Sequence, residues 1–265
     1  MRDVAAAAKS IQEMLDEGGP KDLGYAFDRF SAKMTDMREQ VLAAVPLELD
    51  PDTEDIRTYE GSGGVKGGLL SYRGELLDYF VASWVGNPGL GFLNMHFNAW
   101  VAPKYKIPHL GVVFGTVPDL FFYADFTPRV DMVEHADYSD RYYKPANDDF
   151  LALTGDERLK PFVSLEPYIR LSASPVASGY TGVVSDDTID LVTGVAQKYL
   201  DRWLGWAKDP ERTPADELAA IARRDKAIRM EQGHRDPANP VAVKFFGEEK
   251  SRRLLHGLWG MDVEA

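Results

Sequence analysis

The chain has 265 residues, of which 45% are hydrophobic and 27% charged, a balance typical of a globular domain. It contains no cysteine, which excludes disulfides, thiolate metal sites, cysteine nucleophiles and protein-ligated iron–sulfur clusters. A formal net charge of −12 disfavours nucleic acid as a partner. The longest apolar runs, such as Leu110–Val117, are too short to cross a bilayer, and the first residues lack the apolar core of a secretory signal. We therefore expect a cytoplasmic protein.

The first part of the chain is predicted to be helical. Apolar residues recur at helical spacing within Val4–Leu47, where Gly18-Gly19-Pro20 separates a first helix from a second at Phe27–Val45. The acidic, proline-containing segment Pro46–Glu60 is expected to be a connector. The glycine-rich run 61–68 is expected to be a flexible linker, because it lacks the spacing of a phosphate-binding loop and follows a polar stretch.

From Leu69 onward the pattern changes to strands joined by short links, which favour antiparallel hairpins. Strands are predicted at Leu69–Tyr72, Leu76–Val85, Gly91–Ala102, Pro108–Phe114, Leu120–Phe126, Glu166–Ala173 and Gly179–Val184. Helical segments are predicted at Tyr138–Tyr143, Phe150–Leu153, Thr188–Ala207 (capped by Asp186 or Asp187), Pro214–Met230 and Glu248–Leu258. This order of helices, strands and helices indicates an α+β protein with an antiparallel sheet.

Several common catalytic motifs are missing. No two of the five histidines have the i, i+4 spacing of a helical zinc pair, and there is no Gly-x-Ser-x-Gly nucleophile motif. Metal-dependent hydrolysis and serine-based acyl transfer are therefore unsupported.

Three segments, taken together, resemble a known family. They are Ile107-Pro-His-Leu-Gly111 through Phe126-Thr-Pro-Arg-Val-Asp131, with Tyr138 and Arg141-Tyr-Tyr143; Tyr168-Ile-Arg-Leu-Ser-Ala-Ser-Pro175; and Arg235-Asp-Pro-Ala-Asn-Pro240 leading into Phe245-Phe-Gly-Glu-Glu249. Their order and spacing are similar to the ferredoxin-dependent bilin reductases, and most similar to the red chlorophyll catabolite reductase branch. The resemblance runs from about Leu69 to the C-terminus.

The resemblance implies an α/β/α sandwich, in which helices flank a central antiparallel sheet and an open-chain tetrapyrrole lies between the sheet and the C-terminal helices. It implies a bilin-reductase-like domain at 61–265. The N-terminal helical extension at 1–60 is not covered by the resemblance, and we expect the two parts to form a single compact unit. The resemblance also implies reduction of a bilin such as biliverdin, or of red chlorophyll catabolite. The resemblance further implies that the electrons come from ferredoxin and that no metal or flavin is bound, and it leaves a homodimer open.

Proton delivery to such a pigment requires acidic side chains. Asp236 matches a family aspartate beside a Pro-Ala segment and is predicted to be a proton donor, although an aspartate before Pro237 is also a common turn former. The family's second carboxylate, on the central strand, is replaced here by Val113, which cannot donate a proton. This departure puts the mechanism in doubt and favours an alternative, a non-catalytic tetrapyrrole-binding or carrier protein.

Two histidines are candidates to replace the missing carboxylate. His109 lies four residues before Val113, so strand alternation places both on one face, and His96 is on the preceding strand with polar residues at alternate positions. Asn98 is the alternative match to a family histidine on this strand. Each histidine could instead belong to a solvent-facing stripe.

Arg170 and Ser174 are predicted to contact the substrate. A guanidinium at Arg170 could hold a propionate through two parallel hydrogen bonds, although an ordinary surface ion pair would explain it equally well. Arg129 also matches a family position and is interpreted as structural. Trp84, Trp100, Trp203 and Trp206 are expected in the core rather than against a ligand.

The C-terminal third carries basic residues that could dock an acidic ferredoxin, with solvated helix faces as the alternative; they are Arg223, Arg224, Lys226, Arg229, His234, Arg235, Lys250, Arg252 and Arg253. A further alternative is a different enzyme on the same scaffold that acts on an unrelated apolar acid.

Overall fold

A computed structural model describes residues 22–117 and 119–261. Its strands are β1 Leu47–Leu49, β2 Tyr59–Glu60, β3 Lys66–Gly74, β4 Leu77–Asn87, β5 Phe92–Val101, β6 His109–Thr116, β7 Leu120–Thr127, β8 Leu159–Pro161 and β9 Ser178–Gly182. Its α-helices are α2 Gly24–Ala44, α3 Ala136–Tyr142, α4 Asn147–Thr154, α5 Pro167–Ser172, α6 Asp186–Ala207, α7 Leu218–Arg235 and α8 Asn239–Trp259. No helix among the described residues has the length and apolarity that a membrane span requires.

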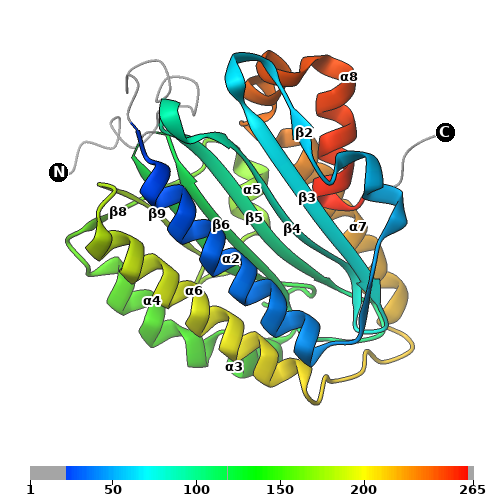
Figure 1. Ribbon diagram of the computed structural model, residues 1–265. Coiled ribbons are helices and arrows are strands. Elements are labelled where there is room, and N and C mark those ends of the chain that lie inside the picture. The colour runs from blue at the N-terminus through cyan, green and yellow to red at the C-terminus, as the bar shows by residue number, and fades with distance from the viewer. Residues whose placement is uncertain (1–21, 118, 262–265) are drawn as a thin grey trace.

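The strands form one antiparallel sheet in the order β1-β3-β4-β5-β6-β7-β9-β8, with β2 added at β3. Helices cover both of its faces, with α2 and α6 on one side and α7 and α8 on the other (Figure 1). The predicted α+β sandwich with a central antiparallel sheet is confirmed. The strands predicted at Leu76–Val85, Gly91–Ala102, Pro108–Phe114 and Leu120–Phe126 correspond to β4, β5, β6 and β7 within a few residues.

The face covered by α2 and α6 holds the main hydrophobic core. In α2, the buried residues recur every three or four positions, so one apolar stripe faces the sheet. Tyr199 and the fully buried Trp203 of α6 lie in the same core, and Phe30 of α2 stacks on Phe114 of β6 with ring centroids 5.0 Å apart. Of the four tryptophans expected in the core, Trp100 and Trp203 are buried, and Trp84 and Trp206 are half-buried against it.

The N-terminal part of the chain packs against the sheet and extends it. Within the predicted extension 1–60, helix α2 contributes to the main core, and β1 and β2 pair with β3 at the sheet edge. The predicted connector Pro46–Glu60 therefore contains two short strands, whose backbone hydrogen bonds need no apolar pattern. The helix predicted between Val4 and Gly18 lies outside the described residues.

The glycine run is part of the packed structure rather than a flexible linker. Gly67 and Gly68 belong to β3, and a Cβ at Gly67 would lie 2.3 Å from the Tyr59 ring. A Cβ at Gly61 would lie 2.5 Å from the Phe246 ring of α8. These glycines allow neighbouring aromatic rings to approach the backbone closely.

The strand predicted at Glu166–Ala173 is wrong. This segment forms the short helix α5, which starts with Pro167 and is capped by Glu166, whose side chain accepts a hydrogen bond from the Tyr168 N–H at 3.1 Å. The predicted cap of α6 is also wrong: Ser185 caps this helix in a reciprocal arrangement with Thr188. Helix α8 starts earlier than expected, at Asn239, and is broken at Gly247.

Candidate functional site

Polar side chains gather on the sheet face that α7 and α8 cover. Cross-strand pairing places Ser83, His96, Val113 and Tyr123 in one row across β4, β5, β6 and β7. A second row on the same face contains Asn98, Gly111 and Asp125, and a third begins with Trp100 and His109. The prediction that His109 and Val113 share a face is therefore correct. So is the alternation of His96 with Asn98 and Trp100.

A cleft opens between this face and α8. It contains about 1120 Å³ of empty space, counting its open mouth. One wall is helical and mostly apolar, and the opposite wall is the sheet; the helical residues are Val241, Ala242, Phe245, Phe246, Ser251, Leu254, Leu255 and Leu258. Most of the lining is apolar, and it includes one histidine, His96, and one carboxylic acid, Asp236. Such a lining suits an extended apolar ligand with a few polar groups.

His96 is half-buried on the sheet side of the cleft, between Ser83 of β4 and Val113 of β6. Desolvation by burial lowers the pKa of His96 to about 4, so its imidazole is neutral at pH 7. Val113 is 9% exposed beside it. Val113, which occupies the position where the family carboxylate was expected, is therefore the direct cross-strand neighbour of His96.

Asp236 lies at the end of α7 and lines the same cleft. One carboxylate oxygen accepts a hydrogen bond from the Ala238 N–H at 2.8 Å, so Asp236 also forms the turn before α8 that we considered as an alternative. Burial raises the pKa of Asp236 above its usual value. The turn fixes the carboxyl group at the cleft, and the two interpretations of Asp236 are compatible.

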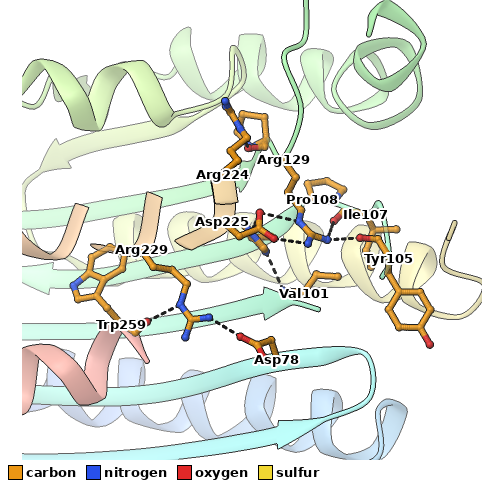
Figure 2. Close-up of polar contacts among 12 residues, drawn as sticks. Asp78, Val101, Tyr105, Ile107, Pro108, Arg129, Arg224, Asp225, Arg229 and Trp259 are labelled. Carbon is orange, nitrogen blue, oxygen red and sulfur yellow. Dashed lines mark hydrogen bonds and ion pairs between the residues drawn. The ribbon is translucent and has the colours of Figure 1, made fainter. Parts of the chain in front are cut away.

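His109 has a different environment. Its Nδ1 accepts a hydrogen bond from the Val101 N–H at 2.9 Å, so Nε2 carries the proton and donates to Asp225 Oδ1 at 3.0 Å. Asp225 in turn accepts two hydrogen bonds from the fully buried Arg129, which also donates to the Tyr105 carbonyl (Figure 2). Burial lowers the pKa of His109 to about 4.

This network attaches α7 to the sheet, and it is consistent with the structural interpretation of Arg129. Both ring nitrogens of His109 are engaged in it, and His109 does not line the cleft. The geometry therefore favours His96 over His109 as a group that could contact a ligand.

Arg170 and Ser174 also lie outside the cleft lining. Arg170 is exposed on α5 and donates to the Ser164 carbonyl. Ser174 is buried, and its backbone N–H donates to Asp125 Oδ2 at 3.1 Å. We leave Arg170 out of the proposed site, because the strand that would have directed it toward a ligand is absent.

Several buried polar atoms on this side of the sheet have no hydrogen-bond partner among the described residues. They are Asn98 Nδ2, Trp100 Nε1, Asp125 Oδ1, Ser251 Oγ and Trp259 Nε1. Burying such atoms without a partner is costly, and one of them, Ser251 Oγ, belongs to a residue that lines the cleft.

Sequence reasoning missed two carboxylates. Asp125 is fully buried in the otherwise apolar strand β7, and a lone acidic residue in an apolar strand is the signal that could have identified it. Asp225 lies among basic residues of α7, and nothing local marks it, because its partners come from β6 and the loop after β7.

A second, more polar cavity lies between α7, α8 and the ends of β3 and β5, with about 2060 Å³ of empty space including its mouth. Arg229 crosses it, donating to the Trp259 carbonyl at 2.8 Å and to Asp78 at 2.7 Å (Figure 2). Lys226 and Arg252 also line it and form no ion pair among the described residues.

Comparison with known proteins identifies the fold and the family of the chain. Phytochromobilin synthase from tomato, solved in complex with biliverdin, has the same fold, with a TM-score of 0.76 and 17% sequence identity over 89% of this chain and 86% of that chain. No curated protein matches the chain. A model of the red chlorophyll catabolite reductase family matches residues 32–259. Because this match covers most of the chain, the protein belongs to the red chlorophyll catabolite reductase family.

Proposed function

We propose that this protein reduces a linear tetrapyrrole with electrons supplied one at a time by ferredoxin. Membership in the red chlorophyll catabolite reductase family supports this activity, and the tomato enzyme of the same fold was solved with biliverdin. The observation that carries the proposal is the cleft between the sheet and α8, where folding brings together His96 and Asp236 from distant parts of the chain.

The chemistry requires protons from the protein. Saturating one double bond adds two electrons and two protons, and a conjugated pigment can accept the electrons singly. Asp236 suits the role of proton donor, because its raised pKa keeps the acid form populated closer to neutral pH. His96 is neutral in the free protein, and negative charge on a reduced pigment would raise its pKa and allow it to take up and pass on a proton.

Basic side chains on the surface of α7 and α8 support the docking of an acidic electron donor. Three basic residues of this region form ion pairs: Arg229 with Asp78, Arg235 with Glu231, and Arg253 with Asp55. Arg223, Lys226 and Arg252 are exposed and form no ion pair among the described residues. These three side chains remain available for a ferredoxin, and salt would weaken such an encounter.

A second candidate function is tetrapyrrole binding without reduction. Val113 favours it, because the apolar side chain beside His96 removes one source of protons from the row. The two functions differ in one observable. If the protein is a reductase, the visible spectrum of the bound pigment changes again when reduced ferredoxin is present, and if it is a carrier, the spectrum does not.

The test uses biliverdin and red chlorophyll catabolite under anaerobic conditions, followed by ferredoxin, its reductase and NADPH, with the visible spectrum recorded throughout. We expect a shift on mixing and a second change that depends on the donor. Asp236→Asn should lower turnover at least about 100-fold and preserve binding, whereas Asp216→Asn, at an exposed position before α7, should match wild type. A shift on mixing alone would support the carrier function, and no shift with either pigment would exclude both functions.

A further inference from the structure

One row of cross-strand neighbours forms much of the sheet wall of the cleft. Strand pairing aligns one residue from each strand between β2 and β7 in this row: Tyr59, Gly67, Val85, Asn94, Gly115 and Phe121. All of them except Gly67 line the cleft. Because paired residues lie side by side across a sheet, the cleft runs across the strands, and successive positions along it are about 4.8 Å apart.

An aromatic pair stands at each end of this row. The Tyr59 ring packs edge to face against Phe246 of α8, with ring centroids 5.5 Å apart. At the other end, Phe121 packs edge to face against Phe162, with ring centroids 5.0 Å apart. All four rings line the cleft. Tyr59 belongs to β2, which pairs with β3 at the edge of the sheet, so its ring marks the end of the cleft on that side.

The Tyr59 side chain lies over β3 instead of extending beyond the sheet edge. A Cβ on Gly67, its partner on β3, would be 2.3 Å from the ring atoms Cε2 and Cζ, so the ring occupies the space above this glycine. The Tyr59 hydroxyl reaches the next strand and donates to the Trp84 carbonyl of β4 at 3.2 Å. The ring therefore covers the β3 position of the row, and the first uncovered position is Val85 of β4.

The end of the cleft at Tyr59 is apolar and uncharged. Burial raises the pKa of Tyr59 above its ordinary value, so the phenol is neutral at physiological pH. Lys66 pairs with Glu60 at 3.2 Å, Lys250 donates to the Glu60 carbonyl at 2.8 Å, and none of these three residues lines the cleft. Four cleft residues share a hydrophobic cluster with Tyr59; they are Leu69, Leu254, Leu255 and Leu258. This end therefore favours an apolar group of a ligand over an ionised one.

We propose that Tyr59 is the end stop of the cleft and determines how long an extended apolar ligand the protein accepts. Removing its side chain uncovers Gly67 and lengthens the cleft by one strand spacing, about 4.8 Å. Applied to a linear tetrapyrrole, this inference rests on the proposed function: the part of the pigment that enters this end is apolar and stops before β3. The end stop itself is defined by the protein alone and acts on any extended apolar molecule in the cleft.

The end stop can be tested without a pigment, with straight-chain fatty acids from octanoate to stearate as rulers. Their carboxylate stays in water at the mouth, and the methyl end enters the apolar end of the cleft. Affinities are measured by isothermal titration calorimetry below the concentrations at which the acids form micelles. While the chain still lengthens inside the cleft, each further methylene should strengthen binding about fourfold, which corresponds to about 0.8 kcal/mol. In wild type this gain should stop at the chain length whose methyl group reaches Tyr59.

Variants of Tyr59 should move this length limit in a graded way. In Tyr59→Ala the gain in affinity should continue for several more methylenes. Tyr59→Leu, whose side chain reaches less far, should move the limit in the same direction by fewer methylenes, and it keeps the test decisive if Tyr59→Ala does not fold. Tyr59→Phe keeps the ring and should keep the wild-type limit. The matched control is Tyr25→Ala on α2, since Tyr25 is 45% exposed, lies outside the cleft lining and also donates to a backbone carbonyl.

An unchanged length limit in folded Tyr59→Ala or Tyr59→Leu would overturn the proposal, and so would the absence of a limit, or of binding, in wild type. Biliverdin absorbance is measured on the same samples. If the limit moves as expected and biliverdin does not bind, the end stop stands and the proposed tetrapyrrole function fails. If biliverdin binds and the limit does not move, the proposed function stands and the end stop fails.

Discussion

His96 and His109 show how position decides the role of one residue type. Both lie on the sheet face toward the C-terminal helices, and burial lowers the pKa of each to about 4. His109 uses both ring nitrogens to attach α7 through Asp225, whereas His96 lines the cleft. The sequence placed both on the correct face by strand alternation, but the partner that separates their roles comes from α7, more than a hundred residues away.

The lowered pKa values of these two histidines predict how the free energy of unfolding depends on pH. Because their pKa values are lower in the folded protein than in the unfolded chain, the unfolded chain binds more protons between pH 4 and 6.5. The free energy of unfolding should fall as the pH drops through this range, by about 2 kcal/mol per histidine between pH 7 and pH 5. Asp125, whose pKa is raised, acts in the opposite direction.

Urea unfolding of wild type, His96→Gln and His234→Gln at pH 7 and pH 5 measures this pH dependence of the free energy of unfolding. Between pH 7 and pH 5, the free energy of unfolding of His96→Gln should fall by about 2 kcal/mol less than that of wild type. The exposed His234 should make no difference when replaced. An identical loss in wild type and His96→Gln would show that His96 is not a buried neutral imidazole.

At the scale of elements, α8 is two helical segments joined at Gly247. This glycine has φ 76° and ψ 168°, a conformation that is essentially restricted to glycine. The segment before it supplies Phe245 and Phe246 to the cleft, and the segment after it supplies Leu254, Leu255 and Leu258. The break therefore sets the angle between two parts of one cleft wall.

Gly247→Ala should destabilise the protein by about 1–3 kcal/mol through backbone strain. A steric clash would not contribute, because no atom lies within 4 Å of the added Cβ. It should also weaken pigment binding, because relief of the strain reorients the Phe245 segment. Gly194→Ala in α6 is the matched control; it also has open space, and we expect a gain of about 0.5–1 kcal/mol in the free energy of unfolding. Thermal unfolding and pigment titration measure both effects, and equal stability of Gly247→Ala and wild type would contradict the assigned strain.

Elements with a long, clear period were predictable. The short elements were predicted unevenly: α3, α4 and β9 overlap predicted segments, whereas β1, β2, β8 and α5 do not match the prediction. Strands β4 to β7 and helix α6 follow apolar patterns over eight or more residues. Tyr168-Ile-Arg-Leu-Ser172 alternates like a strand, but Pro167 and the Glu166 cap start a helix there. Asp236 could be placed at the site by its family resemblance, whereas Asp225 depends on contacts between distant strands and helices.

At the scale of the whole molecule, the two faces of the sheet have different tasks. The face under α2 and α6 is packed with aromatic and aliphatic side chains and supplies stability. The face under α7 and α8 carries the polar rows and the cleft. A protein of net charge −12 also keeps unpaired basic residues on this second side, where an acidic electron donor would approach.

The most direct test of this account asks whether a linear tetrapyrrole occupies the cleft between the sheet and α8. Ala242 lines that cleft, and Ala220 is exposed on α7. The visible spectrum of biliverdin should shift on titration with wild type and Ala220→Trp to the same extent. With Ala242→Trp, whose indole fills the cleft, affinity should fall at least tenfold while thermal unfolding remains cooperative. Wild-type affinity in a folded Ala242→Trp variant would show that the pigment binds elsewhere.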